Sequence, residues 1–194
     1  MSTDESTWRP RNSRLGPAFE LWRSGDLERA LEAMIAAAES YPDDPDAWRG
    51  LGSVYWSGGQ FHAALRAFQT ALTIEYWSPV HWATVGLALR DLGRREGAAH
   101  ALITATLIDP GYAPAWNELA NVLVDSGRPN DALPLYARVL TIDSSRAVYF
   151  HNRGVALRMI GNCAEARRSF TAALELDAGY QWSIAELRRL NPSC

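Results

Sequence analysis

Lysine is absent from this chain, and all nineteen of its basic residues are arginines. A phosphate-binding loop of the GxxxxGK[ST] type, a Schiff base and a lysine general base are therefore excluded. The formal net charge is -3 and the pI is about 5.8, so the sequence has no basic surplus. Nucleic acid and anionic membrane surfaces, which require such a surplus, are not expected partners.

Cysteine is also scarce. Cys163 and Cys194 form no CxxC motif and no ligand cluster with the four histidines, so we expect free thiols, no metal site and no cofactor. No run of 18 apolar residues occurs, and the first seven residues are polar and acidic, unlike a signal peptide. We therefore expect a cytoplasmic protein.

The chain has 14 glycines, and five of them recur every 34 residues, at positions 25, 59, 93, 127 and 161. Further columns keep the same period. They are the alanines 30, 64, 98, 132 and 166, the large residues Met34, Phe68, Leu102, Tyr136 and Phe170, and the aromatics Trp48, Trp82, Trp116 and Phe150. The sequence therefore predicts five copies of one structural repeat.

Within a repeat, the apolar spacing is that of two helices separated by a turn. Trp48, Leu51, Gly52 and Tyr55 follow the pattern i, i+3, i+4, i+7, and a second such series begins at Ala64, after a glycine break. Small residues should allow close helix approach while large ones fill the facing gaps. We expect Trp48 to be buried, so its truncation to Ala should cost about 3 to 5 kcal/mol.

These residues resemble the tetratricopeptide repeat, whose pattern reads W-x2-L-G-x2-Y, then G, then A-x3-F-x2-A. The second repeat carries Trp48, Leu51, Gly52, Tyr55, Gly59, Ala64, Phe68 and Ala71. The resemblance implies an all-α fold, a right-handed α-α superhelix of antiparallel helix pairs. It covers repeats 11–44, 45–78, 79–112, 113–146 and 147–180, with a flexible segment 1–10 before them and a capping helix 181–190 and tail 191–194 after them.

Two proline positions depart from the regular pattern. Gly16-Pro17 should delay the start of the first helix until about Pro17. Pro134 falls about four residues into the second helix of the fourth repeat, and it should bend that helix unless Asn130 caps it.

The resemblance also implies a concave groove, lined by the first helix of each repeat, that binds a peptide or protein segment. The groove residues predicted from their positions are Trp22, Arg23, Arg49, Ser53, Trp56, Leu87, Arg90, Asn117, Asn121, His151, Asn152 and Arg158.

Two groups among these residues have competing interpretations. Trp22 and Trp56 could form, with nearby arginines, an anchoring patch for a carboxylate or a large side chain, or they could only pack against neighbouring helices. Asn121 and Asn152 could hold an extended peptide backbone or could be ordinary surface amides.

We therefore predict a non-enzymatic protein–protein interaction module. Asp91, Glu118 and Asp125 accompany no nucleophile or metal motif, so catalysis is not expected. The alternative is a structural or regulatory subunit of a larger complex, which could include an enzyme, with contacts through the convex face or the ends of the stack. The identity of the partner and the oligomeric state are left open by the sequence.

Overall fold

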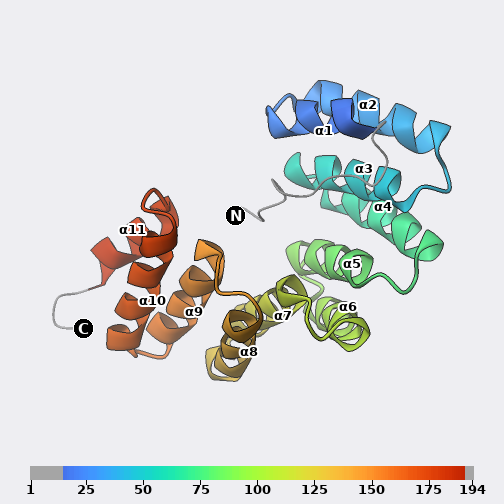
Figure 1. Ribbon diagram of the computed structural model, residues 1–194. Coiled ribbons are helices and arrows are strands. Elements are labelled where there is room, and N and C mark those ends of the chain that lie inside the picture. Colours follow the sequence, from blue (N-terminus) through green and yellow to red (C-terminus); the bar gives the residue numbers. More distant parts are fainter. Residues whose placement is uncertain (1–14, 191–194) are drawn as a thin grey trace. The chain divides into compact units, whose positions relative to one another are not determined.

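The computed structural model describes residues 15–190, which form helices and turns and contain no β-strand (Figure 1). The helices in this range are α1 (Gly16–Arg23), α2 (Leu27–Ser40), α3 (Pro45–Ser57), α4 (Phe61–Ile74), α5 (Pro79–Asp91), α6 (Arg95–Ile108), α7 (Ala113–Asp125), α8 (Pro129–Ile142), α9 (Ala147–Met159), α10 (Cys163–Leu176) and α11 (Gln181–Arg189).

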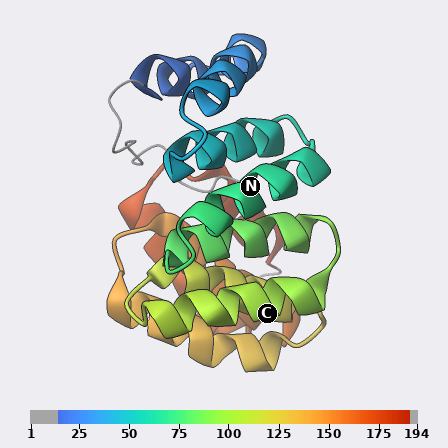
Figure 2. The ribbon, with the colours of Figure 1, turned by 90° about the vertical axis from the view of Figure 1, so that its right-hand side faces the viewer.

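The chain divides after Arg94 into two compact parts, and each is described by itself below. The N-terminal part holds α1 to α5, which stack in sequence order in both ribbon views (Figures 1 and 2). In the C-terminal part, α6 to α11 likewise pack each on the next. Both parts are stacks of helical hairpins, so the predicted all-α class is confirmed.

The glycine column forms the turn between the first and second helix of every repeat. Gly25, Gly59, Gly93, Gly127 and Gly161 all have positive φ, between 72° and 85°. After Gly59, the N–H of Gln60 donates to the carbonyl of Tyr55 at 2.9 Å, which closes the helix end in the manner of a Schellman motif. A side chain with a Cβ would be strained at these positions, so the 34-residue glycine period has a backbone cause.

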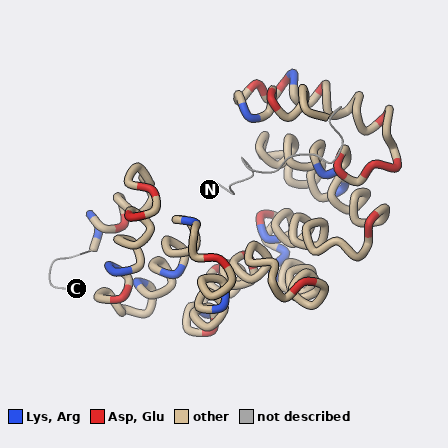
Figure 3. Tube along the Cα trace, in the orientation of Figure 1, with Lys and Arg blue, Asp and Glu red and all other residues tan. Residues whose placement is uncertain are grey.

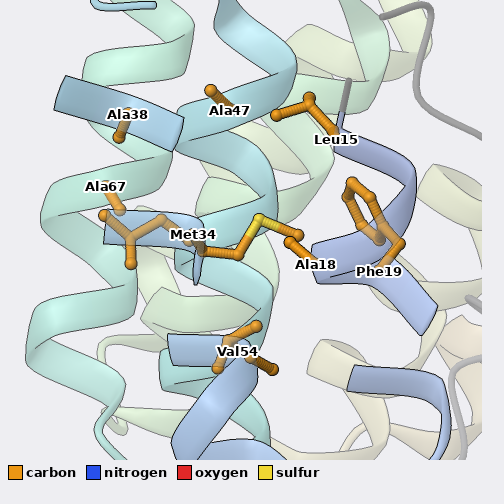
Figure 4. Close-up of a cluster of buried hydrophobic side chains, with 10 residues drawn as sticks. Leu15, Ala18, Phe19, Met34, Ala38, Ala47, Val54 and Ala67 are labelled. Carbon is orange, nitrogen blue, oxygen red and sulfur yellow. The ribbon is translucent and has the colours of Figure 1, made fainter. Parts of the chain in front are cut away.

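The column of large residues forms the core. Met34, Phe68, Leu102, Tyr136 and Phe170 are each at most 1% exposed. Figure 4 shows Met34 among the buried side chains of α1, α2 and α3. A Cβ on Gly52 would overlap the ring of Phe68, as one on Gly154 would overlap that of Phe170. The predicted pairing of small and large residues is therefore confirmed at these sites.

The tryptophan column does not lie in the core, which corrects the expectation for Trp48. Trp48, Trp82 and Trp116 are only half-buried. Each indole Nε1 donates to the carbonyl oxygen of the residue six positions earlier, at 2.8, 2.9 and 3.0 Å respectively. The indole thus stabilises the turn between two repeats through one hydrogen bond. Its truncation to Ala should therefore lower the free energy of unfolding by less than truncation of a fully buried aromatic residue would.

Three local expectations have different outcomes. Pro17 lies in the first turn of α1, which starts at Gly16, as expected. Asn130 is not a cap, because α8 already begins at Pro129 and Pro134 lies inside it. Cys163 is disulfide-bonded, so the expectation of a free thiol is wrong there; Cys194 lies outside the described residues.

Candidate binding faces on the first helices

The predicted groove residues lie on the first helices of successive repeats. These helices are α1, α3 and α5 in the N-terminal part and α7, α9 and α11 in the C-terminal part. Within each part, neighbouring first helices touch: α3 meets α5, α7 meets α9, and α9 meets α11. Each part therefore has its own candidate face.

On the N-terminal face, the two tryptophans bridge neighbouring first helices. Nε1 of Trp22 donates to Oγ of Ser57 at 2.9 Å, and Nε1 of Trp56 donates to Oδ2 of Asp91 at 2.6 Å. Both rings remain half-buried. Beside Trp56 an open pocket of about 500 Å³ is lined by Ser57, Gly59, Phe61 and Asp91. The packing interpretation holds for the indole N–H groups, while part of each ring is accessible.

The arginines expected beside them are bound to carboxylates. The buried guanidinium of Arg49 lies 3.4 Å from Asp46 on the same helix. The side chain of Arg90 is 8% exposed and lies 3.3 Å from Asp91, the residue that also accepts from Trp56. Of the three, Arg23 alone has a well exposed guanidinium, and it pairs with Glu20 at 3.4 Å. The three arginines are thus not assembled into one patch for an anion.

A buried histidine accompanies Arg49. Nε2 of His81 lies 3.1 Å from Oε2 of Glu75, and its Nδ1 is buried without a hydrogen bond. Burial, reinforced by the positive charge of Arg49, lowers the pKa of His81 below its usual value. Ser53 and Leu87 are also buried, so these two predicted groove residues are not accessible on this face.

On the C-terminal face, the predicted asparagines are joined in one hydrogen-bond network. Nδ2 of Asn152 donates to Oδ1 of Asn117 at 3.0 Å, and Nδ2 of Asn117 donates to Oε1 of Glu118 at 3.1 Å. Nδ2 of Asn121 donates to Oε2 of Glu118 at 3.3 Å, while the hydroxyl of Tyr136 donates to Oδ1 of Asn121 at 2.6 Å. Asn117 is buried, whereas Asn121 and Asn152 are half-buried. The network therefore fixes the orientation of two accessible amides.

Between α9 and α11, the predicted Arg158 meets two charged residues, Glu186 and Arg189, that the sequence did not indicate as groove residues. Glu186 of α11 pairs with Arg158 of α9 at 2.8 Å and with Arg189 at 3.2 Å. Nδ1 of His151 lies 3.1 Å from Oγ of Ser183, and burial lowers the pKa of His151. Extending the 34-residue period into residues 181–190 would have found Glu186, which follows Asn152 by one period.

No ligand set for a metal ion occurs between residues 15 and 190, where no three His, Cys, Asp or Glu side chains gather around one point. No helix in this range is both long and apolar enough to cross a membrane. The chemistry on the two faces is that of hydrogen bonds, ion pairs and aromatic contacts.

The class that the fold and these faces define is a stack of helical hairpins with side chains displayed at a fixed period. Two profiles described as tetratricopeptide repeat match residues 18–78 and 111–178, which together make up more than half of the chain. The chain belongs to the tetratricopeptide repeat family, a family of protein–protein interaction modules whose members are generally scaffolds and not enzymes. A search of curated proteins gave no match.

Solved structures of other repeat proteins are similar in fold. TTC0263, a thermophilic TPR protein in Thermus thermophilus, has a TM-score of 0.82 at 19% identity, with 92% of this chain and 97% of that one covered. PilF of Pseudomonas aeruginosa has a TM-score of 0.72 at 16% identity, covering 94% and 92%. YrrB, called a TPR protein with an unusual peptide-binding site, has a TM-score of 0.61 at 23% identity, covering 90% of each chain. At these identities the likeness concerns the fold alone.

Proposed function

We propose that this protein is a non-enzymatic module that binds an extended peptide or protein segment on the face formed by α7, α9 and α11. The N-terminal face contributes less, because Arg49, Ser53 and Leu87 are buried there. In the C-terminal part, Asn121, Asn152 and Arg158 all retain accessible surface.

The observation that carries the proposal is the bond from Asn152 to Asn117. This bond uses one N–H of the Asn152 amide and fixes its orientation. The second N–H and Oδ1 of Asn152 make no hydrogen bond within residues 15–190. An amide with one donor and one acceptor available can pair with both groups of a peptide unit, as a neighbouring strand would.

The charges on the same face supply an orienting element. The side chains of Arg158 and Arg189 are 41% and 74% exposed, and both pair with the single carboxylate of Glu186. One positive charge is therefore left over in this group of three, which favours a bound segment that carries a carboxylate nearby.

The test uses peptides selected from a random library against the whole chain, with affinities measured by calorimetry. Asn152→Ala should weaken binding about tenfold, the equivalent of one or two hydrogen bonds. Asn130→Ala is the matched control, because Asn130 is an exposed asparagine on α8, a second helix. Equal affinities for the wild type and Asn152→Ala would contradict the proposed face.

The second candidate function is a structural or regulatory subunit of a larger complex. The burial of predicted residues on the N-terminal face favours contact through other surfaces of that part. In that case the Asn152→Ala protein would still assemble with its partner and sediment as part of the complex.

The proposal also includes a cytoplasmic location and, as the sequence predicts, no role for nucleic acid or membranes.

A further inference from the structure

One of the turns between repeats has an unusual composition. The equivalent turns are 41–44, 75–78, 109–112, 143–146 and 177–180, and their third residues are Asp43, Trp77, Gly111, Ser145 and Gly179. The second residue is a proline in two of them and Ser or Ala in two others, but it is Tyr76 in the turn 75–78. Two large aromatic residues thus occupy positions where the other turns have small or polar residues or proline.

The turn does not need these aromatics to form. In three other turns the opening Asp accepts a hydrogen bond from the N–H of the third residue, at 2.8 to 2.9 Å. In the turn 75–78 the opening residue is Glu75, which bonds His81 instead, and Nε1 of Trp82 donates to the carbonyl of Tyr76. Any residue could supply that carbonyl, so the rings of Tyr76 and Trp77 are additional to the turn.

The aromatic rings are packed against one another and still reach solvent. Tyr76 lies edge-on to Trp77 and to Trp82, with ring centroids 5.2 and 5.3 Å apart. Trp77 is nevertheless 76% exposed and Tyr76 52% exposed, with the partly exposed Ile74 beside them in sequence. A fixed cluster of large exposed apolar side chains on a small surface is typical of an interaction site.

The charge of this edge indicates what would bind. The turns 41–44 and 75–78, with the helix ends beside them, carry Glu39, Asp43, Asp44 and Glu75 (red in Figure 3). Arg49, on the helix that follows the first of these turns, is buried and paired with Asp46. Residues 15–94 contain ten Asp and Glu residues but six arginines, so this part of the chain is acidic. Exposed indole and phenol faces together with carboxylates attract cations.

We propose that the Tyr76–Trp77 turn, with the carboxylates of this edge, binds an arginine- or lysine-containing segment of a partner protein. The guanidinium or ammonium group would lie on the ring of Trp77, and the exposed carboxylate of Asp43 would contribute to balancing its charge. This surface shares no residue with the C-terminal face, so it does not depend on the function proposed above.

Other occupants fit this edge less well. A symmetric dimer through this surface would place the same carboxylates against each other. An anionic lipid surface would be repelled by them. A proline-rich segment would use the rings but would carry no charge opposite to that of this edge.

The test measures binding of nona-arginine to the whole chain by calorimetry at low and at moderate salt. Trp77→Ala should reduce the affinity between about 2-fold and 30-fold, while Trp77→Tyr should keep part of it. Trp182→Ala is the matched control, because Trp182 is 55% exposed on α11, and it should bind like the wild type. Asp43→Asn/Asp44→Asn should weaken binding and reduce its dependence on salt.

Equal affinity of Trp77→Ala and wild type, with circular dichroism showing both folded, would overturn the proposal. It would also be overturned if decaproline or vesicles of anionic lipid bound more tightly than nona-arginine and lost that binding in Trp77→Ala. A wild-type dimer in sedimentation that Trp77→Ala converts to a monomer would overturn it as well and assign the turn to self-association.

Discussion

At the scale of single residues, the tryptophan column shows how one side chain can serve two neighbouring repeats. Trp48, Trp82 and Trp116 pack beside the core and donate to a turn carbonyl six residues earlier. Phe150 has no N–H to donate, and the turn before it relies on Asp143, which accepts from both the N–H and the hydroxyl of Ser145. A helical-period pattern identifies such positions as apolar but does not reveal which polar atom the ring carries to the turn.

Two histidines should make the stability of the protein depend on pH around neutrality. Burial lowers the pKa of His81, which faces Glu75, Asp46 and Arg49, and the pKa of His151, which faces Ser183 and Glu186. Below about pH 6.5 the unfolded chain therefore binds protons that the folded chain does not. The contribution of these two histidines to stability is fully present above that pH. It is lost as the pH falls through their lowered folded-state pKa values.

Between pH 7.5 and 5.5 we expect the free energy of unfolding, measured by urea titration, to decrease by at most about 1.4 kcal/mol per pH unit for each histidine. His81→Asn should flatten this dependence. His62→Asn should not, since His62 is exposed. An unchanged slope in His81→Asn would show that its burial does not contribute.

At the scale of elements, α8 contains the most evident local conflict. Pro134 is exposed inside this helix, where it has no N–H to donate to the carbonyl of Asn130 one turn earlier. Pro134→Ala should therefore stabilise the protein by about 1 to 3 kcal/mol, measured as a rise in Tm by circular dichroism. Pro129→Ala is the control and should have little effect, because a proline in the first turn gives up no helical hydrogen bond.

Helix positions are the elements that the sequence predicts best, for a physical reason. The first helices α3, α5, α7, α9 and α11 begin at residues 45, 79, 113, 147 and 181, each 34 residues after the last. A glycine at positive φ closes the end of each first helix, and the first turn of a helix tolerates proline. The boundaries are therefore encoded locally. The start of α8 is harder to predict, because Asn130 resembles a cap although Pro129 already begins the helix.

At the scale of the whole molecule, the candidate faces are less predictable than the helices. Position within a repeat indicates that Arg49, Asn117 and Asn152 point toward a first-helix face. Their accessibility depends on contacts with other residues: Arg49 is buried beside Asp46, and Asn117 is buried under a bond from the next repeat. The first pairing joins residues three apart on one helix. The second joins residues about one period apart, which a single repeat does not encode.

The location of the whole protein can be tested through its thiols. Disulfides are rare in the cytoplasm, and Cys163 is disulfide-bonded in this structure. If the proposed cytoplasmic location is right, protein alkylated at the moment of lysis of its host should show two free thiols per chain by mass spectrometry. Protein that resists alkylation until it is reduced would instead indicate an oxidising compartment.

The constant phase of the first helices bears on how such a gene can change in length. Because α11 begins 34 residues after α9, as α9 does after α7, a duplicated coding segment of one repeat would rejoin its neighbours in register. Every glycine turn and every small residue facing a large one would be copied intact. Recombination between repeats can therefore lengthen or shorten this protein without a new core, whereas one extra residue within a helix would rotate the apolar side chains that follow it by about 100°, off the packed face.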